Sequence, residues 1–425
     1  MKLTSVVAQL LLAPLALAAA APGVGKKISY DGYKVFRIST HHDAAEVKDQ
    51  LKSLTAVPFN LNADEHLDIA IAPESLAAFN ALELDAEVLH QDLGADIKEE
   101  AKFGAYGGVS ANAVPSLTWF NTYHAYADHV TFFNDLAGAF PQNSEIFNAG
   151  TSVQGRNLFG IHIWGSGGKG SKPAVYFHGT VHAREWITAK VVEYISYQLL
   201  TKYSTDTAVK AIVDKYDFYI IPFANPDGFV YTQTNDRLWR KNRMTRSGSS
   251  CVGTDINRNW PYKWELTGGA STDKCSETYK GLAAGDTPEN KGLVAFTKSL
   301  QASKGIKLYI DWHSFGQYIL LPYGFDCSAR ASNHARQTTL ATGLANKIRE
   351  SYGTRFTYGP SCSTLYKTTG SSTDYLTDVA KAELAWTIEL RPTGSSSSGF
   401  ILPAAQILPS SIEQWEGMKY LLATM

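Results

Sequence analysis

The chain has 425 residues, of which 44% are hydrophobic and 12% aromatic, and its formal net charge at pH 7 is −1. This near-neutral balance, with no basic excess and no polybasic or amphipathic anchor, argues against a nucleic-acid partner and against a membrane surface. The length allows two or three domains and a core large enough to bury a sizeable interior.

The N-terminal residues predict a signal peptide over residues 1–19. Lys2 supplies a positive start, Leu10–Leu17 an apolar centre, and Ala16–Ala21 the small residues of a cleavage region. The apolar run is too short to span a bilayer, and no later stretch is long and apolar enough to do so. We therefore expect a secreted, extracellular protein.

Cysteine usage fits an oxidising compartment. The chain has four cysteines, and an even number in an exported protein predicts disulfides rather than free thiols. None has C-x-x-C spacing, which argues against a thiolate zinc site and against a redox motif. Four cysteines allow three pairings, of which sequence order suggests Cys251–Cys275 and Cys327–Cys362.

Residues 20–112 form a unit in which strand-like and helical runs alternate. The runs, in chain order, are Lys34–Ile38, Ala44–Leu54, Asp68–Ile71, Pro73–Leu82, Val88–Gln91 and Ile97–Lys102. They predict a small α+β open sandwich, and Gly104, Gly107 and Gly108 after it predict a flexible, exposed stretch.

A compact domain between a signal peptide and a flexible stretch is typical of an inhibitory activation pro-segment. The alternative is an accessory domain that the mature protein keeps, and the sequence does not separate the two. Lys98 and Lys102 are candidate cleavage sites for an activating protease.

Residues 113–425 alternate strands and helices to the C-terminus. Strand-like runs lie at Ala174–Phe177, Leu158–Trp164, Asp217–Phe223, Leu308–Trp312 and Ala385–Leu390. Helical runs lie at Tyr123–Phe140, Ile187–Lys202, Asn290–Ser303, Ser332–Tyr352 and Ser411–Met425. This alternation predicts an α/β fold with helices on both faces of a sheet.

Metal-ligand residues follow three of these strands. His182 and Glu185 follow the first, His313 follows Leu308–Trp312, and Glu389 lies at the end of the last. The carboxyl ends of strands in an α/β sheet can face one crevice. Two histidines and one glutamate then make a zinc site, and a second carboxylate remains to act as a base. A solvated, buried or salt-bridged side chain is the simpler explanation for each residue alone, but the four together favour the site.

Nine motifs then make a specific resemblance. The sequence resembles the secreted zinc metallocarboxypeptidases of the pancreatic carboxypeptidase A/B subfamily, in their proenzyme form, from about Tyr30 to its end. The motifs, in the order of that family, are H-A-R-E-W-I-T, N-P-D-G-F, L-W-R-K-N-R, C-V-G-T-D-I-N-R-N-W, C-S-E-T-Y, I-D-W-H-S-F, L-P-Y-G, T-I-E-L-R-P-T-G and G-F-I-L-P-A.

The resemblance implies the zinc carboxypeptidase fold, with a mixed, largely parallel sheet flanked by helices, over residues 113–425. It implies one Zn²⁺ per chain on His182, Glu185 and His313, with Asp255 orienting the first histidine. Glu389 matches the general base that takes a proton from the attacking water, and Arg240 matches the residue that stabilises the oxyanion.

The resemblance also implies the substrate contacts. Asn257 and Arg258 match the clamp for the free C-terminal carboxylate, which explains removal of one terminal residue. Tyr366 matches the mobile tyrosine that closes over that residue. The remaining contacts are Arg184, Ser314, Phe315, Thr373 and Phe400.

Thr373 stands where B-type enzymes, which select Lys or Arg, carry Asp. A buried cationic side chain would find no partner at this neutral residue, so we expect an A-type preference for apolar or aromatic C-terminal residues. Ser361 and Thr368 make the pocket more polar than is usual for animal A-type enzymes, which leaves the order of preference open.

The implied function is a secreted exopeptidase made as a zymogen. We expect a monomer, with peptide or protein C-termini as substrates and an activating protease as a further partner. Two alternatives stay open: a zinc N-acyl amidohydrolase, and a non-catalytic carboxypeptidase-like binding protein. The carboxylate clamp and Tyr366 argue against the first, and the complete set of ligands and base argues against the second. Neither H-E-x-x-H nor G-x-S-x-G occurs in the chain.

Overall fold

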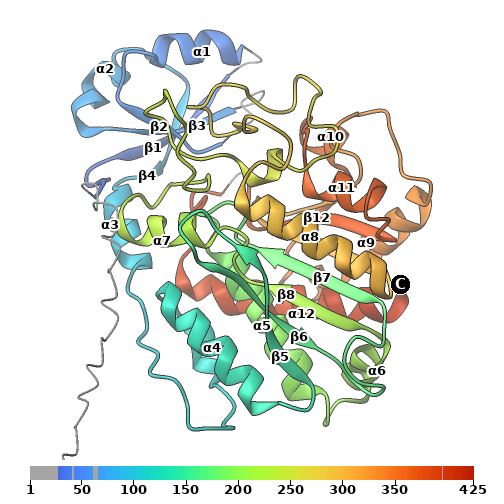
Figure 1. The fold of residues 1–425 in the computed structure, drawn as a ribbon. Helices are drawn as coiled ribbons and strands as arrows, with labels where there is room; N and C mark the ends of the chain where they lie inside the picture. The colour runs from blue at the N-terminus through green and yellow to red at the C-terminus, as the bar shows by residue number, and fades with distance from the viewer. Residues whose placement is uncertain (1–26, 41–42, 61–65, 395) are drawn as a thin grey trace, which may run out of the picture.

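The computed structural model describes residues 27–40, 43–60, 66–394 and 396–425 (Figure 1). The predicted signal peptide, residues 1–19, lies outside this part of the chain. Among the described residues, none of the helices combines the length and apolar character that crossing a bilayer requires.

The described chain forms two sheets, each with its own helices. Its strands are β1 Lys34–Ser39, β2 Ala56–Pro58, β3 His66–Ile71, β4 Ala86–His90, β5 Ser144–Thr151, β6 Asn157–Ile163, β7 Ala174–Gly179, β8 Asp217–Ile221, β9 Ile306–Gly316, β10 Tyr318–Leu321, β11 Thr357–Pro360 and β12 Leu384–Thr393. Its α-helices are α1 Ala44–Leu51, α2 Leu76–Asn80, α3 Leu93–Glu100, α4 Tyr126–Ala139, α5 Ile187–Lys202, α6 Thr207–Lys215, α7 Pro226–Thr234, α8 Pro288–Ser303, α9 His334–Tyr352, α10 Ser361–Thr364, α11 Ser372–Asp378 and α12 Ile407–Thr424.

The larger sheet has eight strands in the order β11-β10-β12-β9-β7-β8-β6-β5. The four central strands, β12, β9, β7 and β8, run parallel, and β10 and β6 join them antiparallel on either side. Their apolar side chains are almost completely buried, as a sheet covered on both faces requires. The predicted mixed, largely parallel α/β sheet is therefore confirmed.

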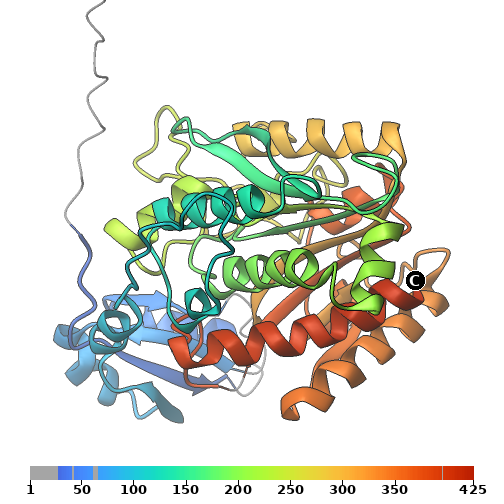
Figure 2. The ribbon, with the colours of Figure 1, turned by 90° about the horizontal axis from the view of Figure 1, so that it is seen from below.

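Helices cover both faces of this sheet (Figure 2). Helices α4, α5, α6, α9 and α12 pack on one face in an aromatic-rich core, and α8 and α11 pack on the other. Side-chain alternation divides β9 between the two cores, because successive residues of a strand point to opposite faces. Leu308, Ile310 and Trp312 enter the first core, whereas Tyr309 enters the second. Asp311 and His313 continue the row of Tyr309.

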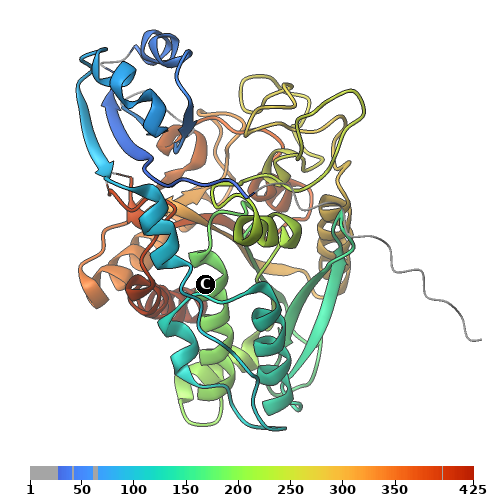
Figure 3. The same ribbon diagram turned by 90° about the vertical axis from the view of Figure 1, so that its left-hand side faces the viewer.

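The N-terminal sheet is antiparallel, with the order β2-β3-β1-β4, and α1 and α2 cover one of its faces. The predicted open sandwich is therefore present. Its other face packs on the larger unit: Val35, Phe59 and Ala70 join Phe400 and Ile401 in one apolar cluster. Figure 3 shows this small domain, in blue, lying against the larger unit.

The glycine-containing stretch after α3 runs along the larger unit; Gly107 and Ser110 are exposed, as expected, and the flexibility of the stretch stays a prediction. The Gly104 N–H donates to the Tyr123 carbonyl at 3.2 Å, and the Tyr106 hydroxyl donates to Asp135 at 2.8 Å. The Phe103 ring contacts the Trp186 ring, with centroids 5.6 Å apart. The aromatic side chains of Phe103 and Tyr106, next to the glycines, thus tie this stretch to the larger unit.

Both disulfides suggested by sequence order are present, joining Cys251 to Cys275 and Cys327 to Cys362. The first closes a loop that contains Asp255, and the second ties the segment before α9 to α10. Several short elements were not predicted from the sequence: β2, β5, β10, β11, α6, α7, α10 and α11.

Candidate metal centre and active-site cavity

The loop after β7 carries the first two metal-ligand residues. The chain turns at Thr180, whose φ of 52° lies in the left-handed region. Thr188 holds this turn, because its Oγ1 accepts from the Thr180 N–H at 2.8 Å and donates to the Glu185 carbonyl at 2.8 Å. The Glu185 N–H donates back to the His182 carbonyl at 3.1 Å. These bonds place both side chains on the same side of the loop.

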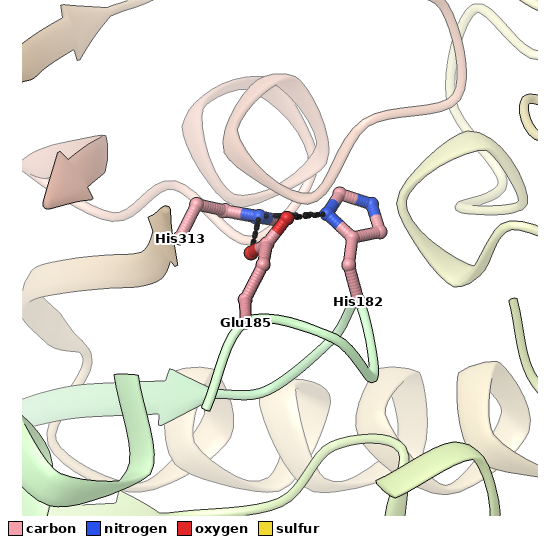
Figure 4. Close-up of side chains that lie close together, drawn as sticks. All are labelled: His182, Glu185 and His313. Atoms are coloured by element: carbon pink, nitrogen blue, oxygen red, sulfur yellow. Dashed lines mark hydrogen bonds and ion pairs between the residues drawn. The ribbon is translucent and has the colours of Figure 1, made fainter. Parts of the chain in front are cut away.

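His182, Glu185 and His313 converge on one point (Figure 4). The Nδ1 atoms of the two histidines are 3.0 Å apart. The Glu185 carboxylate lies 2.8 Å from His182 Nδ1 and 3.0 Å from His313 Nδ1. All three side chains are buried. The structure thus unites the three predicted zinc ligands from two separate parts of the chain.

These contacts fit a shared cation. Two facing Nδ1 atoms can share only one proton, so a cation between them satisfies both lone pairs at once. Tetrahedral Zn²⁺ holds its ligand atoms about 3.3 Å apart, close to the spacing of this set. Two imidazoles and one carboxylate leave a fourth position free, as catalytic zinc sites do.

A buried carboxylate lies behind each histidine. Asp255 Oδ1 is 3.2 Å from His182 Nε2, and Asp311 Oδ1 is 3.0 Å from His313 Nε2. Burial alone would raise the pKa of Asp255, but the charges of Arg240, His182 and Arg258 outweigh it and hold that pKa well below its usual range. Asp255 is therefore ionised and can keep the Nε2 proton of His182, which leaves Nδ1 free to bind metal.

Glu389 and Arg240 flank the metal-ligand residues. Glu389 pairs in register with His313 on neighbouring parallel strands, so the two side chains share one face of the sheet. Arg240 donates to Asp255 Oδ2 at 2.9 Å and lies 3.9 Å from Glu185 Oε1. Burial raises the pKa of Glu389 to about 8, with the nearby Glu185 adding to the effect and His313 and Arg240 opposing it.

A cavity of about 440 Å³ opens beside this centre. Every predicted site residue except the buried Asp255 lines it: His182, Arg184, Glu185, Arg240, Asn257, Arg258, His313, Ser314, Phe315, Tyr366, Thr373, Glu389 and Phe400. The residues singled out from the sequence therefore come from distant segments of the chain and line one cavity.

One end of the cavity carries the predicted carboxylate clamp. Arg258 donates to the carbonyls of Gly269 at 3.1 Å and Asn257 at 3.0 Å, which fixes the plane of its guanidinium. Asn257 Oδ1 accepts from the Ser372 N–H at 2.8 Å. Gly370 passes close to this segment, and a Cβ there would lie 2.4 Å from the Arg258 carbonyl oxygen.

The adjoining pocket is rich in hydroxyl groups. Thr373 and Thr387 exchange a hydrogen bond of 2.8 Å, and Ser361, Thr368 and Ser371 also line the cavity. Asp374 is the carboxyl group in this wall. It accepts from the backbone N–H groups of Gly324 and Phe325, and burial raises its pKa to about 7.

The N-terminal domain covers the cavity. Phe59, Asn60, His66 and Asp68 contribute to its lining. Asp68 pairs with Arg37 at 2.6 Å, and Arg37 also donates to the Gly394 carbonyl of the larger unit at 2.5 Å.

A second, buried ion pair fastens this domain to the larger unit. Glu100, at the end of α3, accepts two hydrogen bonds from Arg237, at 2.6 and 2.9 Å. The same guanidinium donates to the carbonyls of Arg184 and Phe400, both at 2.8 Å. Glu100 therefore contacts a residue that supports the cavity wall.

The comparisons with known proteins agree with this geometry. The family model described as zinc carboxypeptidase matches residues 129–417. The chain belongs to the zinc carboxypeptidase family. The His182, Glu185 and His313 triad is accordingly its zinc site.

Similar proteins span almost the whole chain. A metallocarboxypeptidase A-like protein of Trichophyton verrucosum is 45% identical over 98% of this chain and 99% of its own length. The metallocarboxypeptidase A of Trichophyton rubrum is 42% identical over 96% of both chains. Zinc carboxypeptidase A 1 of Anopheles gambiae is 35% identical over 92% of this chain and 89% of its own.

Solved structures show the same fold. The carboxypeptidase A of Helicoverpa armigera has a TM-score of 0.78 at 25% identity and covers 93% of this chain and 98% of its own. The crystal structure of thrombin-activatable fibrinolysis inhibitor has a TM-score of 0.83 at 24% identity, covering 92% and 98%. Both alignments extend beyond the larger unit, so the small N-terminal domain belongs to the shared architecture.

Sequence reasoning missed several residues at this site. The N-terminal set and the pocket residues Ser371, Asp374 and Thr387 line the cavity through packing that no local pattern encodes. Asp311 was also missed, although a local signal for it exists. Asp311 and His313 are two residues apart in a predicted strand, and such residues point to the same face.

Proposed function

We propose that this protein is a secreted, zinc-dependent exopeptidase that removes single C-terminal residues, prefers apolar or aromatic ones, and is made as a zymogen. The observation that carries the proposal is the single cavity in which a zinc triad, a raised-pKa glutamate and an arginine–asparagine pair lie together. Relatives of 42–45% identity that are named metallocarboxypeptidase A or A-like support it.

Each proposed role follows from position. A zinc ion in such a site polarises a carbonyl and lowers the pKa of a bound water toward about 7. Glu389 takes a proton from the attacking water, and that proton is then available to the amine that leaves when the C–N bond breaks. Arg240, held by Asp255, stabilises the negative charge on the former carbonyl oxygen. Arg258 and Asn257 bind the substrate's terminal carboxylate.

The remaining cavity residues are assigned to substrate positioning. Tyr366 closes over the terminal residue, and Thr373 lies at the floor of the side-chain pocket. Ser314, Phe315 and Phe400 lie along the path of the preceding residues. Arg184, whose guanidinium lies 4.1 Å from the centre of the Phe400 ring, joins them.

We also propose that residues 1–19 are a signal peptide, 20–112 an activation pro-segment and 113–425 the catalytic domain. Coverage of the cavity by Phe59 and Asp68 supports a pro-segment that excludes substrate until it is released. Cleavage at Lys98 would cut within α3, whereas Lys102 follows the end of that helix at Glu100 and is exposed. The two disulfides support secretion.

The test uses one peptide in three forms. The proteolytically activated protein is incubated with the peptide bearing a free C-terminus, with its C-terminal amide, and with the N-acetylated terminal amino acid. Release of one residue from the first form alone, abolished by a zinc chelator and restored by zinc, is the expected result. Cleavage of the acetyl amino acid alone would favour the amidohydrolase, and equal cleavage of the amide would overturn the carboxylate clamp.

A further inference from the structure

Asp311 occupies a fully buried position directly behind the zinc site. It lies two residues before His313 on β9, on the face that carries Tyr309 and the metal-ligand histidine. The sheet register places it beside His178 of β7 and Thr387 of β12. Its relative exposure is 0%, as is that of His178.

Three side chains surround this one carboxylate. Asp311 Oδ1 lies 3.0 Å from His313 Nε2 and 3.2 Å from His178 Nδ1, and Oδ2 accepts from the Ser372 hydroxyl at 2.6 Å. Both imidazole nitrogens lie within hydrogen-bond distance of Oδ1, and both contacts are bent away from ideal hydrogen-bond angles. The far side of His178 is held by Tyr309, whose hydroxyl is 2.5 Å from Nε2.

His313 has two neighbours that favour opposite tautomers. An ionised Asp311 can only accept, so it favours a proton on Nε2 and leaves the Nδ1 lone pair pointing at the zinc position. The side-chain amide nitrogen of Asn257 lies 3.3 Å from the same Nε2 and, as a donor, favours the reverse. The reverse tautomer carries its proton on Nδ1, where it blocks metal binding.

We propose that Asp311 is a positioning residue of the zinc site, which selects the metal-binding tautomer of His313 and holds its ring. Each histidine ligand then has its own buried carboxylate, Asp255 for His182 and Asp311 for His313. The inference rests on the proposed zinc chemistry and extends it to a residue that touches neither substrate nor metal.

Two other contacts hold Asp311 in place. Ser372 begins α11, so its bond to Oδ2 joins the carboxylate to the segment that carries the pocket residue Thr373. His178, which Tyr309 holds in turn, contacts the carboxylate from the neighbouring strand. Displacement of Asp311 would therefore leave the His178 Nδ1 atom and the Ser372 hydroxyl without this partner.

The experiment replaces the charge while keeping the shape. The full chain is produced and activated by proteolysis. In this enzyme, Asp311→Asn should weaken zinc binding about 10–100-fold relative to wild type, as measured by competition with a chromophoric chelator. It should also shift the visible spectrum of the cobalt-substituted protein. Ser372→Ala, which removes only the outer bond, is the matched control and should change zinc affinity less than about threefold. Asp255→Asn should resemble Asp311→Asn.

A second measurement needs no variant. In the zinc-loaded wild-type enzyme labelled with ¹⁵N-histidine, His313 should carry its proton on Nε2. A proton on Nδ1, or an Asp311→Asn enzyme that binds zinc as tightly as wild type while melting at lower temperature, would overturn the proposal and leave Asp311 a packing residue. A wild-type protein that binds no zinc would instead contradict the proposed function itself.

Discussion

The cavity has two contrasting walls. The metal wall, at the ends of β7, β9 and β12, presents ionisable side chains that are buried and contact one another, such as Glu185 and His313. The pocket wall, formed by α10, α11 and the loop between them, presents hydroxyl groups: those of Ser361 and Thr368 are partly exposed, and those of Ser371 and Thr373 are buried. A change in the metal wall leaves a buried charge without its partner, whereas a change in the pocket wall alters which substrate side chains fit. We therefore expect the metal wall to determine the reaction and the pocket wall to determine which C-terminal residue is preferred.

Removing the base should have the largest effect. Glu389→Gln keeps the shape of the side chain but cannot take a proton, so kcat/KM should fall about 10²–10⁴-fold. The variant should still hold one zinc ion and bind a C-terminal peptide as wild type does, as measured by metal analysis and by competition with an inhibitor. If the variant turns over substrate as fast as wild type, Glu389 is not the general base.

The pocket wall is best tested by giving it a charge. Thr373→Asp provides a partner for a cationic side chain at the pocket floor, so the ratio of kcat/KM for Arg over Phe should rise about 10²-fold. Thr373→Asn adds similar bulk without charge and is the control. If Asp and Asn variants show the same ratio, Thr373 does not lie at the floor of the pocket.

The third test concerns the domain that covers both walls. Glu100→Gln breaks a buried, doubly hydrogen-bonded pair with Arg237, so the uncleaved chain should open more often and its peptidase activity should rise about tenfold or more. Asp49→Asn, which removes an exposed ion pair with Lys52 in the same domain, is the control and should change nothing. Equal activities of the two uncleaved variants would argue against Glu100 as a fastening.

The smallest expected effect is a displaced pH profile. As the proposed base, Glu389 would have to be deprotonated to act, so kcat/KM should rise with pH as its proton leaves. Burial raises its pKa from the ordinary 4.5 to about 8, and a bound dication favours the carboxylate and moves it back down. The acidic limb of kcat/KM should therefore lie between these two values. A limb at or below pH 4.5 would mean that the cavity does not perturb this carboxyl group.

The sequence predicted only part of the metal site. His182, Glu185 and His313 are few, chemically distinctive and placed at strand ends, so pattern and resemblance predict their meeting. Asp311 went unnoticed although its spacing from His313 was visible, because an acidic residue in a strand has many ordinary explanations.

The elements of the fold also differ in how well the sequence predicted them. Long periodic segments such as α5 and α9 were predicted, whereas short elements such as β10 and α11 were not. Four to seven residues carry too little periodicity to separate strand from helix, and their structure depends on the neighbours that they contact. The cover provided by Phe59 and Asp68 likewise depends on docking between two domains, which no local pattern encodes.

The most direct test of the central claim is a panel of blocked dipeptides ending in Phe, Leu, Arg or Glu. The activated protein would be assayed with each, with and without a zinc chelator. Chelator-sensitive release of Phe or Leu, with Arg spared, is the result expected of a zinc exopeptidase with a neutral pocket. Absence of any release from protein that holds zinc and has lost its N-terminal domain would contradict the account.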